Sequence, residues 1–426
     1  MVKTIGFLSL GCARNLADSE VLGARLKRKG YKIVDLGSAG DGFSGRASQA
    51  TAVLINTCSF IKEAKEESIR AILDLIELKR QGKFKRLIVS GCLSQRYADE
   101  LPGEFPEIDA VSGVISLNHT QERLRFTPRH YAYVKLCEGC ISNCSFCVIP
   151  RIKQGFVSRP IESVLAEVKD LETQGCREVN LIGQDISAYG LDLYGKLSLA
   201  GMIKQILRNS KRINWLRLLY LSPERLNEEL IQVVSSSPRV AKYIDLPLQH
   251  INNRILGLMR RGTDSSLIFE LLDKLRRKIP GVAVRSSLIV GFPSETEKEF
   301  RQLLDFVKTA RFERLGLFIY SREEGTRAYG LRGQVPQRIK QERYNIIMSA
   351  QQEIARKINA GFLHKSIQVL IEEKQEEGLY IGRSQYDAPE VDGLVYVKSK
   401  KELTIGDFVD VEITDTLEYD LLGEPQ

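Results

Sequence analysis

The stretch YAYVKLCEGCISNCSFC (residues 131–147) joins a strand-like run to a loop that holds four of the chain's eight cysteines. The run, YAYVKL (131–136), is rich in aromatic and apolar residues and predicts a buried β-strand. The cysteines follow it directly. In folds made of βα units, the loops after the strands carry the chemistry. This stretch therefore predicts both the fold and the place of the site.

The four clustered cysteines allow three explanations: disulfide bonds, a zinc site or an iron–sulfur cluster. The start of the chain, MVKTIGFLSLG, does not resemble a signal peptide, and no apolar run approaches the ~18 residues of a membrane span. We therefore expect a cytoplasmic, reducing setting with no membrane partner, where close thiols more often bind metals. Structural zinc takes two CxxC pairs roughly 12–20 residues apart, and Cys140 and Cys144 are too close for that. An iron–sulfur cluster is therefore favoured over disulfide bonds and zinc.

The sequence after residue 130 alternates strand-like and helix-like segments. Its apolar runs are YAYVKL (131–136), EVNLIG (178–183), WLRLLYL (215–221), YIDLPL (243–248), VAVRSSLIVGF (282–292) and RLGLFIYS (314–321). Residues 161–175 and 295–311, which lie between such runs, have the apolar spacing of helices. Strands that alternate with helices in this way predict a partial (β/α)6 barrel of parallel strands.

The first third of the chain places three more cysteines in matching positions. Each ends an apolar run and precedes a helical pattern: TIGFLSLGC (4–12), AVLINTC (52–58) and RLIVSGC (86–92). This predicts an open parallel sheet, in which the loops at the carboxyl ends of the strands converge. The alternative is that Cys12, Cys58 and Cys92 are three separate small buried apolar residues, since free cysteine is often buried. Their shared position favours joint ligation.

The C-terminal segment differs from the rest in charge. The chain carries a net charge of +8, yet residues 367–426 hold 5 Lys and Arg against 15 Asp and Glu. Short alternating strands there predict a small β-barrel. The fold class is therefore α/β, with three domains. Their expected bounds are 1–120 for the open parallel sheet domain, 126–360 for the partial barrel and 361–426 for the small β-barrel.

The spacing CxxxCxxC of Cys140, Cys144 and Cys147 resembles the motif of radical S-adenosylmethionine (radical SAM) enzymes. Three thiolates leave one iron of a 4Fe–4S cluster free to bind a cofactor. The whole chain resembles the methylthiotransferase family, which has a three-cysteine sheet domain, this barrel and a TRAM module of OB-like fold. The stretches that look RimO-like are LGCARNLADSE (10–20), GQDISAYGLD (183–192), DLPLQH (245–250), VGFPSETE (290–297), IGRSQYDAPEVDG (381–393) and YDLLGE (419–424).

The resemblance implies two 4Fe–4S clusters and S-adenosyl-L-methionine as cofactors. The implied ligands are Cys140, Cys144 and Cys147 for the first cluster and Cys12, Cys58 and Cys92 for the auxiliary cluster. One cofactor molecule gives a methyl group to sulfur, and another is cleaved to a radical that removes hydrogen from an unactivated carbon. A general base cannot start such a reaction, because the C–H bond offers no acidic proton. A reducing electron donor and a sulfur source are implied partners.

The resemblance leaves two substrate classes open. RimO-type enzymes modify an aspartate of the twelfth small-subunit ribosomal protein, and the MiaB type modifies adenosine in tRNA. The quoted stretches favour the ribosomal protein. So does charge, because an acidic module repels phosphates and attracts a basic protein. We expect Asp387, Glu390, Asp392, Glu418 and Asp420 to form the contact face; the alternative is a solvated acidic surface that only keeps the module soluble. A non-catalytic iron–sulfur scaffold is disfavoured, because both clusters lack a fourth ligand.

Five residues are candidate cofactor contacts: Gly183, Gln184, Asp185, Gln249 and Arg285. The first three end the second barrel strand, where backbone oxygens of similar enzymes meet the methionine amino group; a solvated turn is the alternative. Arg285 lies within a strand and needs a partner, either the cofactor carboxylate or a structural Asp or Glu. Gln249 and His250 follow the fourth strand, so we expect them to face the mouth of the site.

Two cysteines remain. Cys137 lies three residues before Cys140, where the family usually has no cysteine. As a fourth ligand it would fill the vacancy that the cofactor requires, so we expect a spectator or an occasional redox partner. Cys176 follows a helix-like stretch and is expected to be a plain buried thiol.

Overall fold

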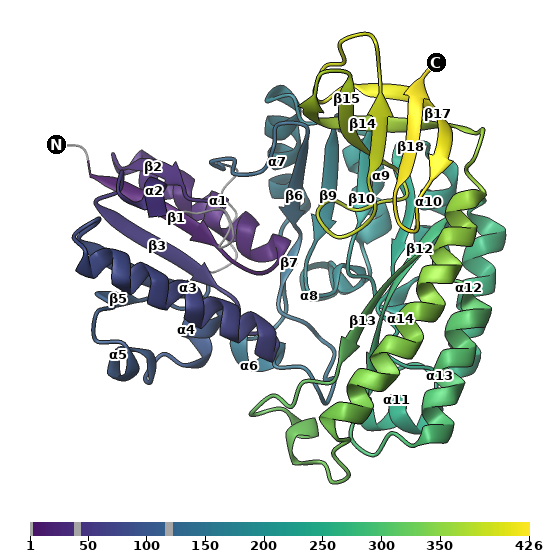
Figure 1. Ribbon diagram of the computed structural model, residues 1–426, viewed down its shortest axis with the longest axis horizontal. Coiled ribbons are helices and arrows are strands. Elements are labelled where there is room, and N and C mark those ends of the chain that lie inside the picture. The colour runs from purple at the N-terminus through teal and green to yellow at the C-terminus, as the bar shows by residue number, and fades with distance from the viewer. Residues whose placement is uncertain (1–2, 38–43, 116–121) are drawn as a thin grey trace.

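Three large sheets follow one another in the computed structural model, which describes residues 3–37, 44–115 and 122–426 (Figure 1). The first is parallel throughout, in the order β2-β1-β3-β4-β5. Its strands are β1 (Thr4–Ser9), β2 (Lys32–Asp35), β3 (Ala52–Thr57), β4 (Arg86–Gly91) and β5 (Ala110–Val111). Its helices are α1 (Ala13–Arg28), α2 (Ser44–Ala47), α3 (Lys62–Arg80), α4 (Cys92–Arg96) and α5 (Leu101–Glu104). The predicted open parallel sheet is confirmed.

Helix α3 shows how this sheet domain acquires its core. Ile72, Leu75 and Ile76 recur at helical spacing, are buried, and pack in one cluster with Val53 and Val89 of the sheet. Strands β2 and β5 are the two edges of the sheet. They are short and mostly exposed or half-buried, so they lack the apolar run by which the central strands are recognised.

The second sheet has six parallel strands in the order β13-β12-β11-β10-β9-β6, which confirms the predicted partial barrel. The strands are β6 (Tyr131–Lys135), β9 (Glu178–Ile182), β10 (Trp215–Leu218), β11 (Val240–Asp245), β12 (Ala283–Val290) and β13 (Arg314–Ile319). A small antiparallel pair, β7 (Cys137–Glu138) and β8 (Val157–Ser158), holds the base of the cysteine loop, residues 137–147.

Helices cover the outside of this barrel (Figure 1). The longer ones are α7 (Ile161–Thr173), α9 (Leu199–Asn209), α10 (Glu228–Ser236), α12 (Ser265–Lys278), α13 (Glu297–Ala310) and α14 (Gln337–Ala360). The short helices α8 (Leu191–Tyr194) and α11 (Asn253–Met259) and the 3-10 turns η1 (Ile186–Ala188), η2 (Pro223–Arg225) and η3 (Arg327–Gly330) follow strands, and α6 (Ile149–Ile152) packs against α4 of the sheet domain. Helix α13 begins with a capping box in which Thr296 and Glu299 satisfy each other's backbone N–H groups. No described helix is both long and apolar enough to cross a membrane.

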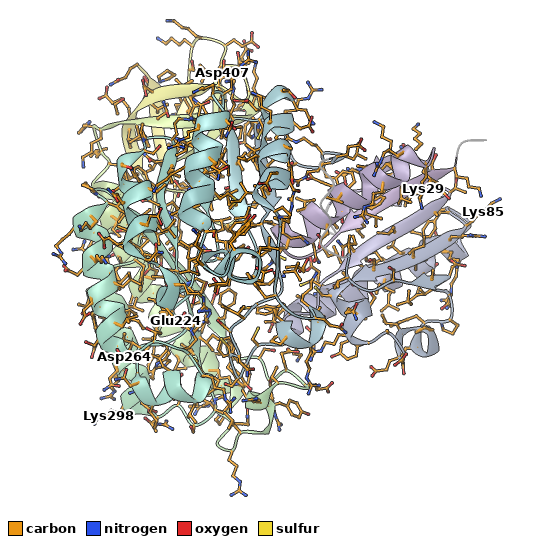
Figure 2. All side chains as sticks on the ribbon, turned by 180° about the vertical axis from the view of Figure 1, so that it is seen from behind. Lys29, Lys85, Glu224, Asp264, Lys298 and Asp407 are labelled. Carbon is orange, nitrogen blue, oxygen red and sulfur yellow. The ribbon has the colours of Figure 1, made fainter. Side chains whose placement is uncertain are left out.

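The third sheet is a closed barrel in the order β14-β15-β16-β18-β17, as predicted. Its strands are β14 (Ser366–Glu376), β15 (Leu379–Ser384), β16 (Val395–Lys398), β17 (Phe408–Thr416) and β18 (Leu421–Pro425). Strand β18 was not predicted as a strand, yet its pairing with β16 and β17 closes the barrel. Seen from behind, Asp407 lies on this small barrel, whereas Lys29 and Lys85 lie at the far end of the sheet domain (Figure 2).

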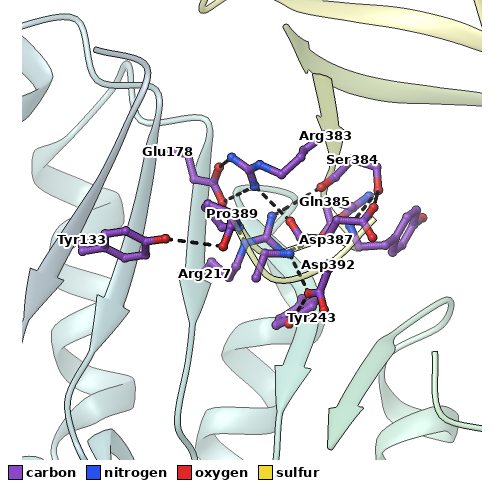
Figure 3. Close-up of polar contacts among 12 residues, drawn as sticks. Tyr133, Glu178, Arg217, Tyr243, Arg383, Ser384, Gln385, Asp387, Pro389 and Asp392 are labelled. Atoms are coloured by element: carbon purple, nitrogen blue, oxygen red, sulfur yellow. Dashed lines mark hydrogen bonds and ion pairs between the residues drawn. The ribbon is translucent and has the colours of Figure 1, made fainter. Parts of the chain in front are cut away.

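The loop between β15 and β16, which we call the insertion loop (residues 385–394), enters the inside of the partial barrel (Figure 3). Asp387 accepts a hydrogen bond from Arg314 Nε at 2.8 Å. Asp392 accepts one from the Tyr243 hydroxyl at 2.6 Å and lies 3.4 Å from Arg285 Nε. The prediction that Asp387 and Asp392 form part of the acidic contact face is therefore wrong. Both are buried and neutralise barrel arginines.

The remaining acidic residues of the expected face differ in exposure. Glu390 and Glu418 are exposed, and Glu390 accepts a hydrogen bond from the Tyr131 hydroxyl at 2.8 Å. Asp420 is half-buried and accepts one from the backbone N–H of Leu394 at 2.8 Å. Only part of the expected face, Glu390 and Glu418, is therefore exposed, whereas Asp387 and Asp392 dock the small barrel to the partial barrel.

A buried ionic cluster joins the small barrel to the amino ends of the barrel strands. Glu178, the first residue of β9, accepts hydrogen bonds from Arg217 Nε at 2.8 Å and from Arg383 Nη2 at 2.6 Å. Arg383 also donates from Nε to Glu372 at 2.9 Å. Arg217 donates to the backbone oxygen of Gln385 at 2.8 Å (Figure 3). The small barrel thus covers the end of the barrel opposite to the cysteine loop.

Candidate active site

A cavity of about 380 Å³ lies where the three domains meet. The sheet domain contributes Arg14, Phe60 and Ile61, the insertion loop contributes Val391, and the strands and loops of the partial barrel contribute the rest. Its lining includes the predicted site residues Cys140, Cys144, Cys147, Gln184, Asp185, Gln249 and Arg285. The structure therefore brings together in one enclosed space residues that are far apart in the sequence.

The cysteine loop is held so that three of its thiols face this cavity. The backbone N–H of Ser142 donates to Cys140 Sγ at 3.4 Å, and Arg261 Nη1 donates to Cys144 Sγ at 3.6 Å. Such N–H groups suit sulfur atoms that carry negative charge. Gly139 permits the turn at the base of the loop, because its φ is 74° and a Cβ there would lie 1.6 Å from the Gly155 oxygen.

The other three cysteines lie at one edge of the first sheet. Cys12 precedes α1, Cys58 follows β3, and Cys92 begins α4. Asn15 ties this edge together, because its amide donates to the backbone oxygens of Leu10 at 3.0 Å and Thr57 at 2.9 Å. Its oxygen lies 3.9 Å from Cys92 Sγ. The close approach of the loops also needs Gly11, where a Cβ would lie 2.6 Å from that of Cys58.

The thiols of this edge differ in their electrostatic surroundings. Burial raises the pKa of Cys58 to about 11 and that of Cys92 to about 12. Burial acts in the same direction on Cys12, but the charge of Arg14 and the hydrogen bond from its Nε, at 3.4 Å, lower the pKa of this thiol overall. Arg14 was not singled out from the sequence, although it stands two residues after Cys12 in LGCARN.

Six cysteines form two triplets, Cys140, Cys144 and Cys147 in the cysteine loop and Cys12, Cys58 and Cys92 at the sheet edge. The ligand atoms of each triplet fit an iron–sulfur cluster. The six cysteines are free thiols with no disulfide between them. Within the described ranges, no three His, Cys, Asp or Glu side chains lie close enough to hold one metal ion. A 4Fe–4S cluster does not require that closeness, since its thiolates bind different irons of the cube. Thiols alone, spaced around a volume and supplied with N–H donors, match a cluster better than a single zinc ion.

The residues after β9 are engaged with their neighbours. The backbone oxygen of Gly183 accepts from Arg14 Nη1 at 3.1 Å. Gln184 donates to Glu138 at 2.8 Å, which leaves its buried Oε1 without a partner among the described residues. Asp185 caps η1 through the N–H of Ser187 and is paired with Arg225. Gln184 therefore keeps one acceptor free beside the cavity.

Arg285 and the segment after β11 complete this side of the cavity. Arg285 Nη1 lies 3.0 Å from Asp245 Oδ1, so the structure supplies a carboxylate partner within the chain. Gln249 lines the cavity as expected, with a φ of 73°. The expectation that His250 faces the mouth is wrong. His250 is fully buried, and its Nδ1 accepts from the N–H of Asn252 at 2.9 Å, because the left-handed turn at Gln249 directs the next side chain into the core.

Cys137 and Cys176 lie outside the cavity lining. Cys137 is fully buried, and its Sγ lies 3.6 Å from the backbone oxygen of Asp185. A Cβ on Gly183 would lie 2.5 Å from this sulfur, so the two residues pack closely. Burial raises the pKa of the Cys137 thiol far above its usual range. Cys176 is a buried thiol, as expected.

Cys137→Ala should leave iron content and cleavage of S-adenosylmethionine unchanged, because its sulfur packs behind the cavity wall. The loss of one buried sulfur should lower the free energy of unfolding by about 1 kcal/mol. Iron analysis and a cleavage assay on anaerobically reconstituted protein check the first expectation, and thermal unfolding the second. Loss of cleavage with normal folding would make Cys137 a ligand.

Comparison with known families and structures gives consistent results. Family models match at residues 4–113 (uncharacterized protein family UPF0004), 134–307 (radical SAM superfamily) and 365–425 (TRAM domain). The radical SAM methyltransferase TsrM from Kitasatospora setae has a similar fold, with a TM-score of 0.55, 14% identity and 75% of each chain covered. Membership of the radical SAM superfamily implies a 4Fe–4S cluster and S-adenosylmethionine.

Curated relatives match over the whole chain. The ribosomal protein uS12 methylthiotransferase RimO of Desulforamulus reducens is 45% identical, with 99% of both chains covered. That of Thermoanaerobacter sp. is 42% identical, with 99% of this chain and 100% of the relative covered. That of Geobacter sulfurreducens is 43% identical, with 99% and 98% covered. The chain therefore belongs to the RimO family of ribosomal protein uS12 methylthiotransferases, within the radical SAM superfamily.

Proposed function

We propose that this protein adds a methylthio group to the β-carbon of an aspartate in ribosomal protein uS12. The observation that carries the proposal is the cavity to which residues of all three domains contribute. Cys140, Cys144 and Cys147 line it, and so does Arg14, which donates a hydrogen bond to Cys12 Sγ. Relatives that match over the full length are named for this activity.

The proposal includes two 4Fe–4S clusters. Their ligands are Cys140, Cys144 and Cys147 for one and Cys12, Cys58 and Cys92 for the other. When bound, the clusters and S-adenosylmethionine supply a radical that removes hydrogen from carbon, and a methylated sulfur. The proposed cofactor contacts are Gly183, Gln184, Asp185, Gln249 and Arg285. The proposed domains are residues 1–120, 126–360 and 361–426.

The chain's own residues orient these groups and exclude water. Arg261 donates to the sulfur of Cys144, which stabilises negative charge there. Asp245 and Asp392 hold the Arg285 guanidinium at the wall. Apolar side chains, among them Phe60 and Leu219, make up much of the lining. A largely apolar enclosure protects a reactive species from side reactions with solvent.

The partners follow from the substrate. A ribosomal protein that contacts RNA is basic, and we propose that the enzyme meets it in the cytoplasm. A reducing protein donor and a separate sulfur source are part of the proposal. Adenosine in tRNA is the weaker alternative. The full-length relatives are named for uS12, and the net charge of −10 in residues 367–426 opposes phosphate binding.

Mass spectrometry of uS12 and of tRNA tests the proposed function. Cells that lack this chain should have uS12 without the methylthio group, and the unaltered gene should restore it. A gene with Cys140→Ala should not restore it, whereas one with Cys176→Ala should. If the modification instead appears on tRNA and uS12 stays unchanged, the tRNA alternative is correct.

A further inference from the structure

Charged side chains around the cavity are almost all paired. The six that line it are Arg14, Asp185, Asp245, Arg261, Arg285 and Glu323. Each of the three carboxylates has a cation within 3.0 Å: Asp185 has Arg225, Asp245 has Arg285, and Glu323 has Arg96. The cations of these three pairs are already engaged, so they offer no free charge to an anion that enters the cavity.

The three cations differ. Arg285 lies near two carboxylates, those of Asp245 and Asp392, and Arg261 lies 4.0 Å from Glu224. Arg14 has no carboxylate partner in the part of the chain that the structure describes. Its Nε donates to Cys12 Sγ, its Nη1 donates to the Gly183 oxygen at 3.1 Å, and its Nη2 makes no hydrogen bond to a described residue. Arg261 Nε also lacks a hydrogen-bond partner, but among the described residues Arg14 is the cavity cation with no carboxylate within 4.0 Å, and its Nη2 is free to donate.

The guanidinium of Arg14 is also fixed in place. It lies over the ring of Tyr220, 4.5 Å from the ring centre. Its two hydrogen bonds reach from a cysteine of the sheet domain to the end of β9 in the barrel. The group is therefore hydrogen-bonded to a cysteine of the sheet-edge triplet and lines the cavity that Cys140, Cys144 and Cys147 face, where a carbon that reacts with both sites has to lie.

The substrate chemistry requires a cation at that place. The β-carbon of aspartate is bonded directly to the carboxylate, so the carboxylate enters the cavity with the reacting carbon. A carboxylate in an enclosed, largely apolar space is unfavourable unless it is paired and hydrogen-bonded. The planar guanidinium of arginine can give a carboxylate two parallel hydrogen bonds.

We propose that Arg14 binds the side-chain carboxylate of the substrate aspartate and so selects aspartate at the site. This inference rests on the proposed function, because it takes an aspartate of uS12 as the substrate. The amide of asparagine has the same shape but no charge, so it loses most of this interaction. The alternative ligand of Arg14 is the carboxylate of S-adenosylmethionine.

An experiment that combines a substitution in the enzyme with one in uS12 distinguishes these two ligands. Binding of uS12 and of uS12 with the modified aspartate changed to Asn is measured by fluorescence anisotropy on the reconstituted enzyme with S-adenosylmethionine. The unaltered enzyme should bind the Asn form about 10- to 100-fold more weakly. In Arg14→Met the two forms should bind equally, since the discriminating charge is gone. Arg254→Met, which breaks an ion pair with Glu299 on the outer helices, should discriminate as the unaltered enzyme does.

Arg14→Lys keeps the charge but not the planar pair of donors, so it should retain only part of the discrimination. If Arg14→Met takes up less iron, the discrimination measured with Arg14→Lys decides the test instead. Full discrimination in both variants overturns the inference, as does a loss of S-adenosylmethionine affinity with discrimination intact. Failure of the proposed function is a different result: uS12 then gains no methylthio group from the unaltered enzyme.

Discussion

Changing Cys140, Cys144 and Cys147 together to Ala is expected to halve the iron content of the reconstituted protein and to abolish cleavage of S-adenosylmethionine. The three thiols face one cavity, and the other three lie at a separate sheet edge, so one cluster should be lost and the other kept. Methylthio transfer to uS12 should fall below detection, because no other group in the proposed site starts the radical reaction. Iron and sulfide analysis with a cleavage assay checks this.

The matching variant at the sheet edge gives the complementary result. Cys12, Cys58 and Cys92 changed to Ala should also halve the iron, yet cleavage of S-adenosylmethionine should persist while methylthio transfer stops. Cys176→Ala, which removes a buried thiol outside the cavity, should change neither. Full iron content in either triple variant would show that the two triplets are not the ligands.

Arg383→Met is expected to lower the free energy of unfolding by about 3–5 kcal/mol. Arg383 is only 1% exposed and donates to Glu178, which is fully buried at the start of β9. Its removal leaves Glu178 with Arg217 alone and frees Glu372 from its strongest partner. Denaturant unfolding, followed by the fluorescence of Trp215, which packs against Phe408 of the small barrel, measures the loss.

An exposed ion pair serves as the control for this variant. Arg356 and Glu353 lie 3.0 Å apart on α14, and both are largely exposed. Arg356→Met should therefore leave the unfolding transition unchanged, because solvent screens such a pair. Equal shifts for the two variants would mean that the buried cluster does not hold the small barrel to the partial barrel.

The same cluster makes the stability depend on pH. Burial alone would raise the pKa of Glu178, but Arg383 and Arg217 lower it overall. A carboxyl whose pKa is lower in the folded chain stabilises it above the unfolded pKa, and this contribution is lost as pH falls through the folded value. In Arg383→Met the pKa of Glu178 should rise, so acid unfolding should begin at higher pH.

Much of the fold follows from local patterns in the sequence. Apolar runs such as residues 52–58 and 178–183 mark central strands, because these strands are buried on both faces. The rule that parallel strands end at one edge correctly placed Cys12, Cys58 and Cys92 together. Edge strand β2 and closing strand β18 were missed, because their pairing partners rather than their own residues define them.

The errors concern charges that are paired over long sequence distances. Asp387 and Asp392 belong to an acidic segment, and nothing near them in the sequence indicates that they meet Arg314 and Arg285 inside the barrel. Arg14 has a sequence signal that could have been used, since a charged residue two positions after a predicted ligand lies within reach of that ligand. Its lack of a carboxylate partner among the described residues becomes apparent only from the cavity.

The insertion loop also ties the site to the order in which a ribosome makes the chain. All six strands of the partial barrel precede residue 320, but Val391, which lines the cavity, and Asp387, the carboxylate partner of Arg314, come about 70 residues later. A nascent chain that has just released α14 therefore lacks part of the cavity lining and the carboxylate that pairs with Arg314. A substrate therefore meets the complete cavity only after translation has passed the insertion loop.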